Sequence, residues 1–96
     1  MDTWLRREAQ KELQSASAWY EEQRGGLGGK FLDDFLSTVE TMESDPELYA
    51  QITSGIRRAL LRRFPYAIIY SVEDTHIQIL GVKHCHGNPE NWPTGA

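Results

Sequence analysis

The sequence predicts a single α+β domain in which a hairpin of two helices packs on a small, mostly antiparallel sheet of three to four strands. Two amphipathic helical patterns in the first half, strand-like runs in the second half, and glycine- or proline-containing segments between them lead to this prediction. The 96 residues are enough for one domain, which we place at 1–96. Helices on one face of such a sheet form a two-layer structure.

The first helix follows a short apolar segment. Residues 3–5 are apolar enough for a short first strand at one edge of the sheet. From about Arg6 the pattern becomes helical, because apolar residues recur at steps of three and four. These residues are Leu5, Ala9, Leu13, Ala16 and Tyr20. The pairs Gly25-Gly26 and Gly28-Gly29 end the pattern, since helices commonly stop at glycine.

A second helical pattern follows the glycines. Its apolar residues are Phe31, Leu32, Phe35, Leu36, Val39 and Met42. It ends near Ser44, because Pro46 pushes the residue before it out of helical geometry. A short glycine turn between two such helices predicts an antiparallel hairpin. Aromatic residues at helical or strand spacing are expected in the core, namely Trp19, Tyr20, Phe31, Phe35 and Tyr70.

The second half of the chain reads as strands. Residues 47–55 are expected to form a connecting loop with one turn around Leu48 and Tyr49, and 56–61 mix apolar residues with arginines. Residues 67–72 and 77–82 are rich in β-branched and aromatic side chains, and Glu73-Asp74 forms the turn between them. Pro65 belongs at a strand start or a bulge, because it has no N–H for a sheet ladder.

Composition narrows the class of protein. The net charge of −4 argues against a protein that coats nucleic acid. The single cysteine, Cys85, excludes an internal disulfide framework and fits a reducing compartment. No apolar run approaches the roughly 18 residues of a membrane helix, and the first residues do not resemble a signal peptide. We therefore expect a cytoplasmic protein without a membrane partner.

The charge is unevenly distributed along the chain. Residues 1–55 carry five basic and eleven acidic side chains, whereas residues 56–96 carry five basic and three acidic ones. Four arginines lie within seven residues: Arg57, Arg58, Arg62 and Arg63. Arginine suits bidentate contacts with carboxylates and phosphates, so the cluster predicts an anion-binding patch. The alternative is structural, with some arginines paired to Glu40 or Glu43 or protecting an edge strand.

Two histidines near the end are candidates for catalysis. His84 and His86 are two residues apart, so in extended backbone their rings point the same way. Imidazoles could act as base and acid in RNA cleavage at the 2′-hydroxyl, with arginines stabilising the transition state. The alternative is a local hydrogen bond for His84 and a solvated His86. No metal and no cofactor are expected, because a structural zinc site needs four ligands and no second cluster accompanies these residues.

Several blocks of the sequence resemble RelE/ParE-type toxins. The helical part of the resemblance lies in the segments WYEEQ at 19–23, GLG at 26–28 and Phe31-Leu32. The strand part lies in IRRALLRRFPYAIIY at 56–70 and in the ending His84, Pro89 and Trp92. The resemblance implies the fold given above and the toxin of a type II toxin–antitoxin module for plasmid stabilisation or stress. It also implies growth inhibition and neutralisation by a cognate antitoxin, and it allows a homodimer or a hetero-oligomer with the antitoxin.

The chain departs from this family pattern at two places. Relatives often have two arginines after the final histidine, where this chain has His86 and Gly87, and RelE-type nucleases carry a catalytic arginine where it has Ala67. This favours ParE-like inhibition of DNA gyrase over ribosome-dependent mRNA cleavage, and it leaves open a degenerate, non-toxic antitoxin-binding module. Tyr66 is expected to stack on a base or to hold the sheet corner, and Trp92 to contact a target or to fix the tail on the sheet.

Overall fold

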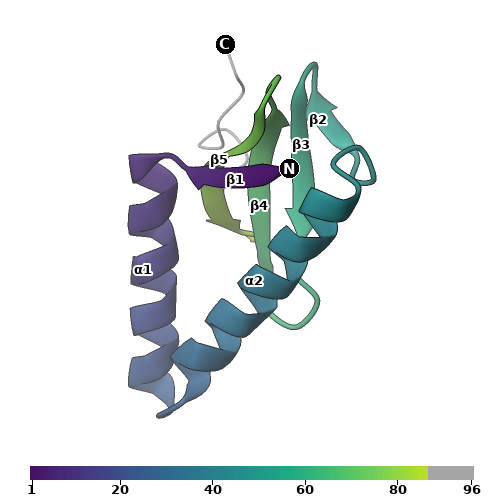
Figure 1. The fold of residues 1–96 in the computed structure, drawn as a ribbon. Helices are drawn as coiled ribbons and strands as arrows, with labels where there is room; N and C mark the ends of the chain where they lie inside the picture. Colours follow the sequence, from purple (N-terminus) through teal and green to yellow (C-terminus); the bar gives the residue numbers. More distant parts are fainter. Residues whose placement is uncertain (87–96) are drawn as a thin grey trace.

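The computed structural model describes residues 1–86, in which two helices cover one side of a five-stranded sheet (Figure 1). The helices are α1 (Arg7–Gln23) and α2 (Leu27–Ser44). The strands are β1 (Asp2–Leu5), β2 (Gln51–Thr53), β3 (Ile56–Leu60), β4 (Tyr66–Val72) and β5 (His76–His84). Their order is β1-β5-β4-β3-β2, and only β1 and β5 pair in parallel. The predicted α+β class, with its helical hairpin and mostly antiparallel sheet, is confirmed.

The sheet has one strand more than the upper predicted number. The first strand is present and pairs with β5, as in Thr3 with Ile77. The prediction that 47–55 is only a connecting loop is wrong, because Gln51–Thr53 forms the edge strand β2 beside β3. All three of its residues are exposed, so it shows none of the apolar alternation by which a half-buried strand is recognised. A tight turn with Gly55 at φ 79° leads back into β3.

The turn between the helices depends on glycine and on one glutamate. Gly26 adopts φ 88°, a conformation that favours glycine. The Glu21 carboxylate accepts the backbone N–H groups of Gly26 at 2.9 Å and Gly28 at 3.0 Å, which would otherwise lack a partner at the start of α2. Gly28 also lies so close to α1 that a Cβ there would be 2.6 Å from the Ser17 carbonyl oxygen. Both features fix how the hairpin closes.

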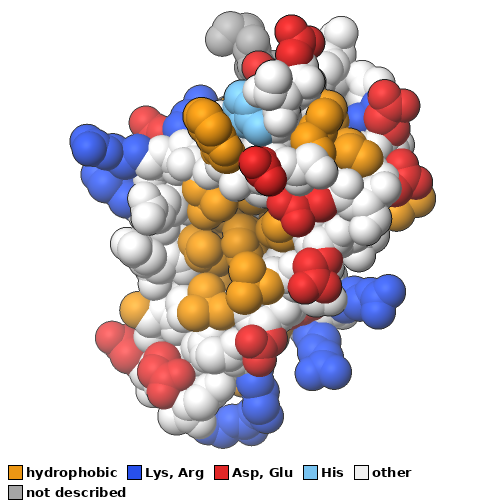
Figure 2. Space-filling model, in the orientation of Figure 1, with side chains coloured by type: hydrophobic (Ala, Val, Ile, Leu, Met, Phe, Trp, Pro, Cys, Tyr) orange, Lys and Arg blue, Asp and Glu red, His pale blue; other side chains and the backbone are white. Residues whose placement is uncertain are grey.

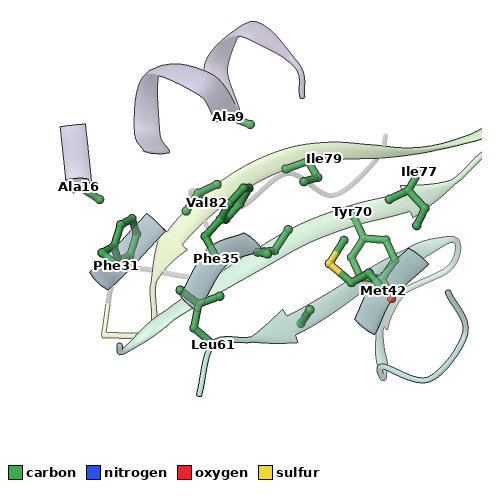
Figure 3. Close-up of a cluster of buried hydrophobic side chains, with 12 residues drawn as sticks. Ala9, Ala16, Phe31, Phe35, Met42, Leu61, Tyr70, Ile77, Ile79 and Val82 are labelled. Carbon is green, nitrogen blue, oxygen red and sulfur yellow. The ribbon is translucent and has the colours of Figure 1, made fainter. Parts of the chain in front are cut away.

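The main core lies between the helices and the sheet. In Figure 3, Phe31 and Phe35 from α2 point toward Val82 of β5, and Tyr70 from β4 lies beside Met42. Further buried members of this cluster are Ala9, Ala16, Ala59, Leu61, Ile68, Ile77 and Ile79. The prediction that Trp19 lies in the core is wrong, because it is 55% exposed. Leu36, from the second apolar helical pattern, is 56% exposed. A smaller cluster of Ile56, Ala67 and Ile69 packs with Leu80 on a different part of the sheet.

A bulge in β5 shapes the edge of the sheet beside α1. Ile69 pairs with Gly81 and Tyr70 with Ile79, so Leu80 is the extra residue between them. Arg6 donates its backbone N–H to the Ile79 oxygen at 3.0 Å and its guanidinium to the Leu80 oxygen at 2.9 Å. These bonds satisfy the outer edge of β5 where the parallel pairing with β1 ends.

Candidate functional site

One buried carboxylate holds the turn between β3 and β4. Asp34 of α2 is 7% exposed and accepts three backbone N–H groups. The donors are Arg62 at 3.3 Å, Arg63 at 2.8 Å and Phe64 at 3.1 Å. Backbone N–H groups withdrawn from water need such acceptors, so the turn is fixed against α2.

Two of the predicted arginines project from this fixed turn. Arg62 and Arg63 are exposed and line a hollow of about 290 Å³ together with Lys30, Asp33, Asp34 and Ser37 of α2. We call this the basic hollow. Within residues 1–86, the side chains of Lys30, Arg62 and Arg63 form no hydrogen bond or ion pair. Figure 2 shows Lys and Arg side chains standing out beside α2, in the region below it.

The structure does not gather the four arginines into one patch. Arg57 lies on the helix-covered side with the buried Ala59, and its Nη1 donates to the carbonyl oxygens of Tyr49 at 2.7 Å and Glu47 at 3.2 Å. The helix-covered side therefore accommodates one arginine side chain. Arg58 is exposed and alternates with Arg57 along β3. Arg57 therefore fastens the segment after α2, and only Arg62 and Arg63 share a hollow.

The segment that Arg57 holds also binds a buried tyrosine. Tyr70 is fully buried in β4, and its hydroxyl donates to the Pro46 carbonyl oxygen at 2.8 Å. Burial raises the pKa of Tyr70 to about 12, which the positive charge of Arg57 partly opposes. Tyr70 thus stays neutral and structural over the physiological range.

The predicted histidines lie where β4 begins and β5 ends. Tyr66 pairs with His84 across the two strands, and their ring centroids are 5.1 Å apart. His84 and His86 have ring centroids 5.3 Å apart, as their two-residue spacing predicts. The His86 backbone N–H donates to His84 Nδ1 at 3.1 Å, so the neutral His84 ring carries its proton on Nε2. Burial raises the pKa of Tyr66, whose ring also contacts Phe31.

His84 and Tyr66 line a second hollow, of about 460 Å³, between α1 and the end of β5. We call it the α1–β5 hollow. Trp19, Lys11 and Lys83 are among its other lining residues, and Lys83 is ion-paired with Glu12. No residue lines both this hollow and the basic hollow. The structure therefore places His84 beside lysines and aromatic rings, whereas Arg62 and Arg63 line the other hollow.

The other predicted residues do not line either hollow in the described part of the chain. Trp92 and Gly87 lie outside the described residues. Cys85 is exposed at the end of β5, and burial raises the pKa of its thiol while the charge of Arg58 opposes the rise. Ala67 is fully buried in β4. Residues 1–86 contain no group of His, Cys, Asp or Glu side chains that could hold a metal ion.

Sequence reasoning missed Asp34 and Lys30 as parts of the site. The signal for Asp34 was an acidic residue within the apolar stripe that contains Phe31 and Phe35, where an unpaired carboxylate would be unfavourable. Lys30 had no such signal, because an exposed lysine near the start of a helix is ordinary. Neither helix within residues 1–86 has the length and apolar character needed to span a membrane.

One family model and a solved structure are similar to this chain. A family model described as the ParE toxin of type II toxin-antitoxin system, parDE, matches residues 5–89. A solved structure described as the chromosomal ParDE TA system from P. aeruginosa has a similar fold, with a TM-score of 0.72 and 23% sequence identity. The alignment covers 88% of this chain and 95% of that one. No curated protein matches the chain.

Proposed function

The chain belongs to the ParE toxin family of type II toxin–antitoxin systems, and from this premise we propose that it inhibits growth by acting on DNA gyrase. The observation that carries the choice of target is that His84 and the exposed arginines Arg62 and Arg63 line different hollows. RNA cleavage requires a base, an acid and cations around one phosphate. No arginine lines the hollow of His84, and Ala67, at the position of the nuclease arginine, is buried and uncharged.

The family description includes an antitoxin, and we propose that a ParD-type protein neutralises this chain. An exposed apolar surface between the helices supports a protein partner. Leu13 and Leu32 line a groove of about 340 Å³ there, and the exposed Leu36 lies one turn beyond Leu32 on α2. Figure 2 shows hydrophobic side chains gathered on the face that carries α1 and α2. Contiguous exposed apolar area of this kind is typical of protein interfaces.

The test is a supercoiling assay with purified gyrase. Adding the purified chain should inhibit supercoiling and leave cleaved DNA, and co-purified antitoxin should abolish both effects. Expression alone should arrest growth, and co-expression with the antitoxin should restore it. Growth arrest without any effect on gyrase would contradict the proposed target. Antitoxin binding without growth arrest would instead identify a degenerate binding module, for which arginines introduced at positions 86 and 87 should create toxicity.

A second candidate function, ribosome-dependent mRNA cleavage, is favoured by one observation. His84 shares the α1–β5 hollow with Lys11 and Lys83, so an imidazole lies near two cations. In a translation-coupled cleavage assay, His84→Ala should then abolish cleavage, while Arg62→Ala should leave it intact. Absence of cleavage by the unmodified chain would remove this candidate.

A further inference from the structure

We infer that the basic hollow binds a carboxylate side chain of a protein partner, and that Asp34 is the residue that positions Arg62 and Arg63 for it. The identification of that partner as the antitoxin rests on the proposed function. The existence of the site rests only on the geometry of α2 and the β3–β4 turn.

The charges around the hollow leave a cationic surplus. Lys30, Arg62 and Arg63 contribute three positive charges, and Asp33 and Asp34 contribute two negative ones. The Asp34 carboxylate already accepts three backbone N–H groups, so its charge is largely satisfied within the fold. Within the described chain the three cationic side chains have no ion-pair partner. An anionic ligand would provide the missing ion-pair partner for these side chains.

The surroundings favour one carboxylate over a nucleic-acid backbone. The chain carries a net charge of −4. Further along α2 and just after it are the exposed carboxylates of Glu40, Asp45 and Glu47. A nucleic-acid strand brings one phosphate per nucleotide and would meet this acidic stretch. A glutamate or aspartate of a protein brings a single charge, and its planar carboxylate matches the guanidinium of Arg62 or Arg63.

Asp34 prepares the site before a ligand arrives. Its three hydrogen bonds fix the backbone from Arg62 to Phe64, so binding needs to order only the exposed side chains. Asp34 is only 7% exposed, so it offers little surface to a ligand. It acts through the turn, and its loss should weaken binding even though both arginines remain.

The test is a titration of the full chain with a capped peptide of alternating Glu and Gly residues, followed by amide chemical shifts. Shifts should concentrate at residues 30–37 and 61–65 and should saturate. Arg62→Ala with Arg63→Ala should weaken binding at least about tenfold, because two charge-assisted contacts are lost. The matched control is Arg7→Ala with Arg24→Ala, which removes the same charge from two exposed arginines elsewhere and should leave affinity unchanged.

Two aspartate variants test the positioning role. Asp34→Asn places an NH₂ group against backbone donors and should weaken binding severalfold. The salt dependence should be kept, because all three cations remain. Asp33→Asn should strengthen binding, since it removes a competing charge from the hollow without touching the turn. Equal behaviour of the two aspartate variants would overturn the role of Asp34.

The outcomes separate this inference from the proposed function. Equal loss of binding in the arginine pair and its control would show a non-specific charge effect and overturn the site. Tighter binding of an oligothymidylate of equal charge at the same amides would overturn the choice of a carboxylate. Peptide binding retained by a chain that leaves gyrase unaffected would sustain the site and refute only the proposed target.

Discussion

Replacing Gly28 by alanine should loosen the helical hairpin. An added Cβ at this position would lie 2.6 Å from the Ser17 carbonyl oxygen, and 3.0 Å and 3.1 Å from Oε1 and Cβ of Glu21. The Ser17 oxygen belongs to the backbone of α1 and cannot rotate away, so α2 has to move. The movement would also disturb the bonds from Glu21 to the N–H groups of Gly26 and Gly28.

The neighbouring Gly29 provides a matched control. A Cβ there meets nothing within 4 Å. Gly29→Ala should therefore show only the gain in helix propensity, a stabilisation of about 0.5–1 kcal/mol. Gly28→Ala receives the same gain, but overpacking typically costs about 1–3 kcal/mol, and the backbone contact places it in the upper part of that range. We expect a net destabilisation of about 1–2 kcal/mol, so that the two variants differ by about 2–3 kcal/mol.

Urea unfolding followed by far-UV circular dichroism measures this difference. With a slope of about 1 kcal/mol/M for a chain of this size, the midpoints of the two variants should lie about 2–3 M apart. The slopes themselves should agree, because both variants expose the same surface on unfolding. Equal midpoints, or a Gly28→Ala variant more stable than Gly29→Ala, would refute the argument that the helices approach closely at Gly28.

Two further changes test the polar contacts of the fold. Asp34→Ala removes the acceptor of three backbone N–H groups and should lower the free energy of unfolding, measured in urea, by about 3 kcal/mol. Replacing the exposed Asp33 by alanine should change it by less than about 0.5 kcal/mol. Similar losses in the two variants would contradict the role given to Asp34. Because burial raises the pKa of Tyr70 to about 12 from the value of 10.0, the folded chain holds this proton more tightly, and stability should fall as pH rises from about 10 to 12. In Tyr70→Phe the loss of stability between about pH 10 and 12 should be about 2 kcal/mol smaller. Below about pH 9 the variant should be about 1 kcal/mol less stable than the unmodified chain, since the hydrogen bond to Pro46 is lost. Parallel declines in the two proteins would show that Tyr70 is not the titrating group.

The helices and the central strands could be predicted because their signals are local. The glycines end α1, Pro46 limits α2, and apolar periodicity marks both helices. The parallel pairing of β1 with β5 has no such signal, since it joins segments more than seventy residues apart. β2 is short and exposed, so neither length nor alternation distinguishes it from a loop.

Periodicity shows that a helix has an apolar stripe, but it does not show which part of that stripe the rest of the fold covers. Trp19 and Leu36 belong to apolar helical patterns, yet both are more than half exposed, because α1 and α2 diverge from their turn and leave part of each stripe open (Figure 1). Aromatic character and helical spacing predict a core position for Trp19, but neither property shows how much of the stripe is covered. The exposed Leu36 lies one turn beyond Leu32, which lines the groove between the helices with Leu13.

Several carboxylates of the acidic first half have a structural role other than pairing with arginines. The helix carboxylates bind backbone N–H groups: Asp34 accepts three from the β3–β4 turn, Glu21 two from the start of α2, and Glu12 that of Val82. Glu43, a predicted arginine partner, accepts a bond from Thr3 instead. Three acids of the first half thus hold the backbone, and Arg62 and Arg63 have no internal counterion in the described chain. It follows that removing these acids should destabilise the fold, whereas removing the two arginines should leave stability intact and alter only what the surface binds.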